Sequence, residues 1–296
     1  MNRTIVITGC SSGFGKLAAE RLARGGDRVY ATMREISGRN APKAKEIEAI
    51  AKEKGLDIRV IELDVTSTES VNAAAARVSE ESGGADVVIN NAGQMFVGIT
   101  ECFDEQELTR QLDINVVGVH RMNRAFLPTM RAQSSGLVIN ISSVAGRIAI
   151  PFFGVYHASK WALEGYSHAL RYELATSGVD VVLIEPGPFS TELFGTSPAP
   201  ADADARTATY VSVVPETLKQ MSGGFGAMFE SPEVPTDPMI VVERMVELVE
   251  MEPGTRPFRS VCGVDFDVGG MNAACDPYQS GVVEAMGICE FATIKA

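Results

Sequence analysis

The sequence predicts an α/β fold: a doubly wound parallel sheet of about seven strands with helices on both faces. Two observations lead to this prediction. Short β-branched runs alternate with longer segments of helical spacing, as the crossover connections between parallel strands require. The runs are almost continuously apolar, which is typical of strands that are buried on both faces of a sheet.

The expected elements follow one another in a regular order along the chain. The strands are expected at 4–8, 28–32, 58–63, 86–90, 137–142 and 180–185, with a weaker seventh at 260–264. Helical spacing predicts helices at 16–24, 43–54, 67–81, 104–130 and 159–176. A further helix is expected to begin at Asp237 and Pro238, an N-cap and first-turn pair, and to stop at Pro253.

One stretch departs from this alternation. Residues 195–206 are rich in Pro, Ala and Asp and indicate an irregular loop, and residues 207–229 mix helical polar spacing with apolar side chains. We interpret 195–236 as an excursion from the sheet within a single domain that spans 1–296. At roughly 100–200 residues per domain the length also permits two small domains, but no second alternation supports that division.

Composition excludes several classes of function. The 296 residues carry a formal charge of −12, which disfavours nucleic acid or an anionic membrane as a partner. No apolar run approaches the ~20 residues that span a bilayer, and no targeting signal is visible, so we expect a cytoplasmic protein. Five cysteines without a C-x-x-C pair and three dispersed histidines indicate reduced thiols and no metal site.

A glycine-rich turn joins the first strand to the first helix. Glycines at this point permit a tight turn, and they let backbone amides approach a pyrophosphate at the positive end of the helix. The position, after a strand and before a helix, is the one that dinucleotide binding requires, as in Rossmann-like folds. The cofactor-binding residues predicted in this turn are Gly9, Ser11, Ser12, Gly13, Phe14 and Gly15.

Charge at the end of the second strand favours NADP over NAD, although NAD stays possible. A fold that prefers NAD places Asp or Glu about 20 residues beyond the glycines, where the carboxylate binds the ribose 2′-hydroxyl. This sequence has Arg34 there, and a guanidinium suits a 2′-phosphate. The alternative is that Arg34 is a solvated charge beside Glu35.

Tyr156 and Lys160 form a candidate acid–base pair, because residues four apart share one face of a helix. An unperturbed phenol has a pKa of about 10. A cation about 4 Å away contributes roughly 4 kcal/mol at an effective dielectric near 20, which is on the order of three pK units. Lys160 is therefore expected to lower the pKa of Tyr156 toward neutral pH. His157 is expected to face elsewhere, because adjacent helical residues point about 100° apart.

Several motifs follow one another in order: Thr8-Gly9-x-x-x-Gly13-x-Gly15 after the first strand, Asn90-Asn91-Ala92-Gly93 after the fourth, Ser142-Ser143 after the fifth, and Tyr156-x-x-x-Lys160 in the next helix. This order resembles the short-chain dehydrogenase/reductase family over about residues 1–194. Segments 30–34 and 156–165 most resemble its branch of 17β-hydroxysteroid and retinol dehydrogenases. The resemblance implies that Ser143, thirteen residues before Tyr156, contacts the substrate oxygen, whereas Ser142 is structural. It also implies that Asn115 holds a water linked to Lys160. The remaining cofactor-binding residues that it implies are Asp64 and Val65 at the adenine, Asn91, Ala92 and Gly93 at the floor, Pro186, Gly187, and Thr191 at the carboxamide, together with Tyr156 and Lys160.

The function expected from these features is hydride transfer between NADP and a hydrophobic secondary alcohol or its ketone or aldehyde, with Tyr156 as the acid and base. Apolar residues are expected to rim the substrate, and no Arg or Lys is evident for a carboxylate, although many of these side chains could equally fill the core. They are Met95, Phe96, residues 148–153, Phe189, Leu193 and Phe194.

Two other functions stay open at this point: a non-catalytic dinucleotide sensor, and an epimerase or dehydratase that retains NAD. By resemblance the chain is expected to form a homodimer or homotetramer, in which helices near 104–130 and 156–176 pair. The substrate and the physiological direction do not follow from the sequence.

Overall fold

The computed structural model describes residues 2–295 and confirms the predicted sheet. Seven strands lie in the order β3-β2-β1-β4-β5-β6-β7, and each neighbouring pair is parallel. The strand order reverses between β1 and β4, which is the point where doubly wound sheets open a crevice for a ligand. The strands are β1 Thr4–Ile7, β2 Arg28–Met33, β3 Ile58–Glu62, β4 Val87–Asn90, β5 Gly136–Ile141, β6 Val179–Pro186 and β7 Arg259–Cys262.

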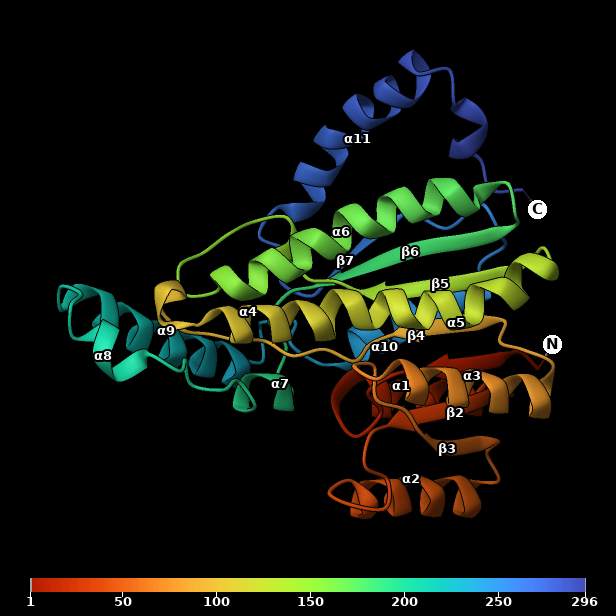
Figure 1. Ribbon diagram of the computed structural model, residues 1–296, viewed down its shortest axis with the longest axis horizontal. Helices are drawn as coiled ribbons and strands as arrows, with labels where there is room; N and C mark the ends of the chain where they lie inside the picture. Colours follow the sequence, from red (N-terminus) through yellow and green to blue (C-terminus); the bar gives the residue numbers. More distant parts are fainter. Residues whose placement is uncertain (1, 296) are drawn as a thin grey trace.

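Helices cover both faces of the sheet (Figure 1). Helices α1, α2 and α10 pack against one face, and α3, α5 and α6 pack against the other. Their bounds are α1 Gly13–Arg24, α2 Ala41–Lys54, α3 Thr68–Ser82, α5 Gly118–Ala132, α6 Gly154–Ala175 and α10 Met239–Glu250.

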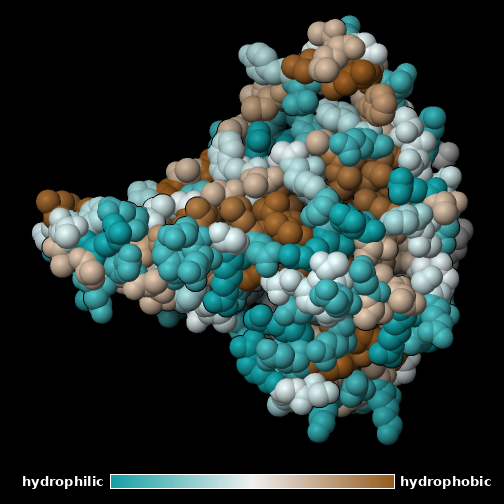
Figure 2. All heavy atoms as spheres, in the orientation of Figure 1, coloured by the Kyte–Doolittle hydropathy of each residue, from teal (hydrophilic) through white to brown (hydrophobic). Residues whose placement is uncertain are grey.

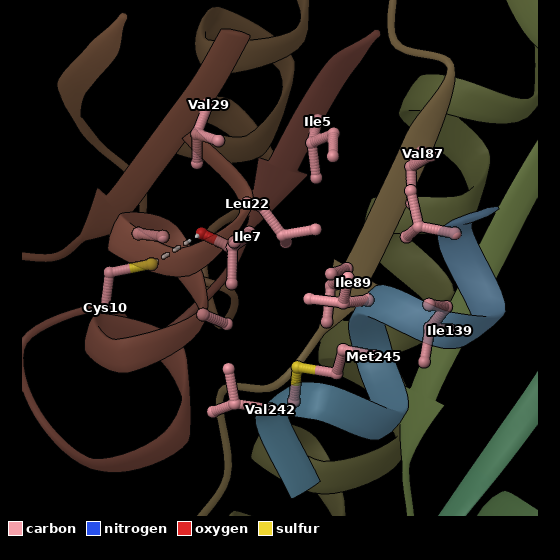
Figure 3. Close-up of a cluster of buried hydrophobic side chains, with 14 of the residues drawn as sticks. Ile5, Ile7, Cys10, Leu22, Val29, Val87, Ile89, Ile139, Val242 and Met245 are labelled. Carbon is pink, nitrogen blue, oxygen red and sulfur yellow. Dashed lines mark hydrogen bonds between the residues drawn. The ribbon is translucent and has the colours of Figure 1, made fainter. Parts of the chain in front are cut away.

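Alternation of side chains along each strand divides the core into two layers. Ile5 and Ile7 of β1 face α1 and α10, whereas Val6 between them faces the helices of the other side. Figure 3 shows the first layer, in which Leu22 of α1 and Met245 of α10 join Ile7 and Ile89 of the sheet in one cluster. Every strand of the inner sheet therefore needs apolar residues at successive positions, which is why the sequence shows continuous apolar runs.

The helix expected over 104–130 is interrupted, and this corrects the prediction. The structure has α4 Glu105–Leu112, then a π-helical turn Asp113–Val117, and then α5. A π-turn inserts one residue into the helical path, and such insertions occur mostly at functional sites. Helices α1 and α6 also begin three and five residues earlier than expected.

The excursion forms an arm that projects from the body, visible at the left of Figure 1. It contains α7 Glu192–Gly195, α8 Ala203–Thr207 and α9 Val213–Glu230, so part of the stretch expected to be irregular is helical. Val214, Leu218 and Met221 of α9 pack toward Phe153 and other buried residues of the body. Apolar atoms gather where the arm joins the body in Figure 2.

Beyond β7 the chain forms α11 Val268–Ala285, which stands off the body in Figure 1, and then a 3₁₀ turn, η4 Cys289–Ala292. The chain end returns to α6, where the amide of Lys295 donates to the carbonyl of Ala175 at 2.9 Å. Within residues 2–295, no helix has both the length and the apolar composition needed to cross a bilayer.

Candidate active site

A cavity of about 1070 Å³ lies at the carboxyl ends of the central strands. Loops that follow β1, β4, β5 and β6 line it, and α6 and α9 close it on one side. The cavity brings together Ser143, Tyr156 and Lys160, as well as every predicted cofactor-binding residue except Gly15. Asn115 does not line it.

The geometry of the glycine turn fits a dinucleotide pyrophosphate. Gly9 and Gly13 have φ values of +73° and +54°, a backbone region that favours glycine. A Cβ on Gly9 would lie 2.9 Å from the Cα of Ala92, so the turn and the loop after β4 are in close contact. Helix α1 begins at Gly13, and the Ser12 side chain does not cap it. The first amides of α1 therefore face the cavity, where they can bind an anion.

Asn91 fastens the loop after β4 to this turn. Its Nδ2 donates to the carbonyl oxygens of Thr8 at 2.8 Å and Gly9 at 3.2 Å. The Thr8 hydroxyl in turn accepts from the amides of Asn91 and Ala92, at 3.0 and 2.9 Å. Gly15 serves the same junction from behind the cavity, since a Cβ there would lie 2.5 Å from Asn91 Nδ2.

Three cations line the end of the cavity beyond β2. Arg34, the predicted residue, has no ion pair with any part of the chain from residue 2 to 295. Arg39 and Lys43, which the sequence reasoning missed, lie beside it at the start of α2. Lys43 pairs with Glu192 of α7 at 2.9 Å. Their closeness to Arg34 in the sequence, within ten residues, was a possible signal for Arg39 and Lys43. Only the fold shows that all three side chains line the same cavity.

Ser143 links three elements at the site. Its Oγ accepts from the amide of Ala145 at 3.1 Å and donates to the carbonyl of Pro186 at 3.2 Å, which joins the ends of β5 and β6. It also forms a hydrogen bond with Tyr156 that lowers the pKa of the phenol. The hydroxyl of Ser142 also borders the cavity, and it has no hydrogen-bond partner among the residues that the structure describes.

Burial changes the predicted acid–base chemistry of the pair on α6. Lys160 Nζ lies 5.7 Å from the ring centroid of Tyr156 and donates to the carbonyl of Ile141 at 2.7 Å. Burial raises the pKa of Tyr156 to about 12, the opposite direction from the prediction. Burial also lowers the pKa of Lys160 to about 8. The prediction was wrong because ionising a phenol among apolar side chains carries a desolvation cost that opposes the effect of the nearby ammonium.

Asn115 braces the site from the π-turn. It is 1% exposed, its Oδ1 accepts from the amide of Gln94 at 3.0 Å, and its Nδ2 donates to the Gln94 carbonyl at 2.9 Å. Nδ2 also donates to the hydroxyl of Ser159 at 3.0 Å, and Ser159 donates to the carbonyl of Tyr156 at 2.7 Å. Asn115 thus ties the loop after β4 to the helix that carries Tyr156, and the implied water link stays a prediction.

Both ring nitrogens of His157 bind backbone groups. Nε2 accepts from the amide of Ile150 at 2.9 Å, and Nδ1 lies 2.8 Å from the carbonyl of Ala145. These partners require the neutral ring with the proton on Nδ1. His157 therefore holds the loop between Ala145 and Ile150, which forms one wall of the cavity.

The far half of the cavity is apolar, as expected, with two corrections. Phe96 is fully buried and stacks on Phe103, with centroids 6.0 Å apart, so it belongs to the core. Arg110 lines the cavity, so one cation is present that the sequence did not single out. The side chain of Phe194 lies outside the described residues. The apolar lining consists of Met95, Ile148, Ile150, Phe153, Phe189, Leu193, Met221, Phe225, Met228 and Phe266.

Comparison with known proteins identifies the family. The sequence model described as short chain dehydrogenase matches residues 3–201. The chain belongs to the short-chain dehydrogenase family. A 3-ketodihydrosphingosine reductase of Bacteroides thetaiotaomicron is 42% identical over 187 residues, which are 63% of this chain and 64% of the relative. Human 17-beta-hydroxysteroid dehydrogenase type 1 is 44% identical over 197 residues, 64% of this chain and 58% of the relative.

These matches confirm the predicted family and its hydroxysteroid dehydrogenase branch. The chain spans about three-fifths of the length of these two curated relatives. Human retinol dehydrogenase 8 is also similar, at 37% identity over 219 residues, 73% of this chain and 67% of the relative.

Solved structures confirm the fold over nearly the whole chain. A short-chain dehydrogenase from Streptomyces avermitilis has a TM-score of 0.72 and 31% identity, and the match covers 97% of this chain and 99% of that one. An alcohol dehydrogenase from the archaeon Thermococcus sibiricus, solved with 5-hydroxy-NADP, has a TM-score of 0.70 and 25% identity, with 90% and 98% covered.

Proposed function

We propose that this protein is an NADP-dependent oxidoreductase that interconverts a hydrophobic secondary alcohol and its ketone, or an aldehyde. One observation carries the proposal: Ser143, Tyr156 and Lys160 line the same cavity as the glycine turn. A protein that only sensed a dinucleotide would not need these three side chains together beside an apolar space.

The protein side chains take distinct parts in this reaction. A nicotinamide cofactor, when bound, supplies or accepts the hydride. Ser143 Oγ holds the substrate oxygen by a hydrogen bond, and Tyr156 Oη gives that oxygen a proton in reduction and removes one in oxidation. With a pKa of about 12, Tyr156 is protonated at neutral pH, which is the form that carbonyl reduction requires. Lys160 places a positive charge beside the phenol and favours its deprotonated form.

Three features support NADP as the cofactor. Arg34, Arg39 and Lys43 gather at the end of the cavity where a ribose 2′-phosphate would lie. Glu35, the nearest carboxylate in sequence, is exposed, pairs with Arg39 at 3.6 Å and does not line the cavity. The Thermococcus relative was solved with an NADP derivative. Guanidinium groups bind phosphate oxygens with bidentate geometry.

The apolar half of the cavity supports a hydrophobic substrate. Met221, Phe225 and Met228 of α9 face the loop that contains Ile150 and Phe153 across this space. We assign the 195–236 excursion to the substrate side of the site on this ground. A hydrophobic alcohol or ketone of steroid or retinoid size fits such a lining, and the curated relatives carry names of that class.

The test follows NADPH oxidation at 340 nm against panels of hydrophobic and charged carbonyl compounds. Tyr156→Phe is expected to lower kcat by about 10²–10⁴-fold, the usual contribution of a positioned acid, while the Kd for NADPH changes little. Tyr172→Phe is the matched control, because Tyr172 lies on the same helix and stacks on His168 outside the cavity.

Three results would contradict the proposal. Substantial residual turnover in Tyr156→Phe would show that Tyr156 is not the acid and base of the reaction. Faster turnover of the charged panel would oppose the hydrophobic substrate. Tight NADPH binding without turnover of any compound would favour a sensor.

A further inference from the structure

A buried network of charges lies behind Lys160, and the mechanism above does not use it. Glu164 follows Lys160 by one helical turn and is 3% exposed. Its Oε2 accepts a hydrogen bond from Nε of Arg259 in β7 at 2.8 Å. The same Nε lies 3.6 Å from Oε1 of Glu185 in β6. Two carboxylates therefore share one guanidinium in the protein interior.

The C-terminal helix completes this network. Nδ2 of Asn272 in α11 donates to Glu185 Oε2 at 2.6 Å. Its Oδ1 accepts from Nε of Arg147, which follows the short turn η3 Val144–Gly146, at 2.7 Å. Asn272 therefore connects α11 to α6 through Glu185, Arg259 and Glu164 in turn.

Arg259 binds only one oxygen of the Glu164 carboxyl group. Its second oxygen, Oε1, makes no hydrogen bond within residues 2–295. Lys160 and Glu164 share one face of α6, yet the Lys160 ammonium is directed to the carbonyl of Ile141. Glu164 therefore acts on Lys160 through space, and its charge raises the pKa of the lysine against the opposing effect of burial.

We propose that Glu164 is a positioning residue that keeps Lys160 in its ammonium form, and that Arg259 fixes the carboxylate for this purpose. The inference rests on the proposed function, since it concerns the lysine of that site. A buried amine loses its proton readily unless a carboxylate lies nearby, and Glu164 supplies that carboxylate. The charged and titratable groups around Glu164 are Lys160 and His168, each one turn away on α6, Arg259 on β7, Glu185 on β6 and Arg147 after η3.

Glu185 offers a matched control within the same network. Burial and the charge of Glu164 raise the pKa of Glu185 to about 8, so this carboxyl is mostly protonated at neutral pH. Glu185→Gln imitates the protonated form and keeps the partners, whereas Glu164→Gln removes a charge. The two substitutions have the same size and the same neighbours, and they differ in the charge that Lys160 experiences.

The experiment compares pH profiles of kcat/KM for carbonyl reduction. In Glu164→Gln, Lys160 loses its proton at lower pH, so the alkaline limb is expected to move down by about one pH unit, the order of a partly screened charge one turn away. Glu185→Gln should leave the limb in place, and Glu164→Asp should return it toward the wild-type position. An unmoved limb in Glu164→Gln, or an equal movement in Glu185→Gln, would overturn the inference.

A second measurement separates this inference from the proposed function. Trace acetylation of Lys160 over a pH series, followed by mass spectrometry, reports titration of the amine without turnover. The acetylation midpoint should fall in Glu164→Gln and stay constant in Glu185→Gln, even if no substrate is found; a constant midpoint in both overturns the inference. If Glu164→Gln fails to fold, the double variant Glu164→Gln/Arg259→Met also removes the buried guanidinium that would otherwise lose its carboxylate partner. It should show the same shift, and a constant midpoint would again overturn the inference.

Discussion

Gly15 allows a quantitative test of how the glycine turn is built. A Cβ at this position would lie 2.5 Å from Asn91 Nδ2 and 2.6 Å from the Gly9 carbonyl oxygen, closer than real Cβ atoms approach. Its φ is not positive, so the cost of Gly15→Ala is steric. Asn91 must move and weaken two hydrogen bonds worth about 0.5–1.5 kcal/mol each. Overpacking adds roughly 1–3 kcal/mol, so we expect a loss of about 2–6 kcal/mol in total.

Denaturant unfolding of Gly15→Ala measures this loss, and Gly165→Ala is the matched control. Gly165 is also helical, but a Cβ there meets nothing within 4 Å. Alanine at Gly165 should therefore raise stability by up to about 1 kcal/mol. Because Asn91 and Ala92 line the cavity, the Kd for NADPH should also rise in Gly15→Ala. A free energy of unfolding within about 1 kcal/mol of the wild type, with unchanged NADPH binding, would refute this account of the turn.

Two further predictions concern charge. Arg34→Asp should lower the NADP-to-NAD ratio of kcat/KM by roughly 100-fold, since it removes a charge-assisted hydrogen bond and adds repulsion; an unchanged ratio in steady-state kinetics would oppose the assignment. Glu185 has a pKa raised from 4.5 to about 8 by burial and by Glu164. Its stabilising effect is therefore fully present below pH 4.5 and is lost as pH rises through 8. The Tm of Glu185→Gln minus the Tm of the wild type should therefore increase as the pH is raised from 5 to 9. A difference that stays constant over this range would contradict the prediction.

Local patterns predicted the sheet, and most of the site residues that they singled out line one cavity. Residues 5–7 are apolar at successive positions because Val6 and its two neighbours meet different helix layers. Ser143, Tyr156 and Lys160 lie close together in the chain, and all of them follow the end of β5, so their spacing predicts a shared cavity. Arg39 and Arg110 were missed because their relation to the cavity depends on how α2 and α4 pack. Phe96 was misplaced because hydrophobicity alone does not distinguish a rim from a core.

The ionisation of the site could not be read from motifs at all. Helical spacing places an ammonium near a phenol: Lys160 Nζ lies 5.7 Å from the Tyr156 ring centroid, and this positive charge contributes to deprotonation of the phenol. Burial of both groups opposes this contribution and is the larger effect for Tyr156, whose pKa moves to about 12. The same burial would strip Lys160 of its proton if no carboxylate stood nearby. Glu164 is that carboxylate, and Arg259 holds it from a strand almost a hundred residues further along the chain. The charge that decides the state of the lysine is therefore a property of the assembled fold.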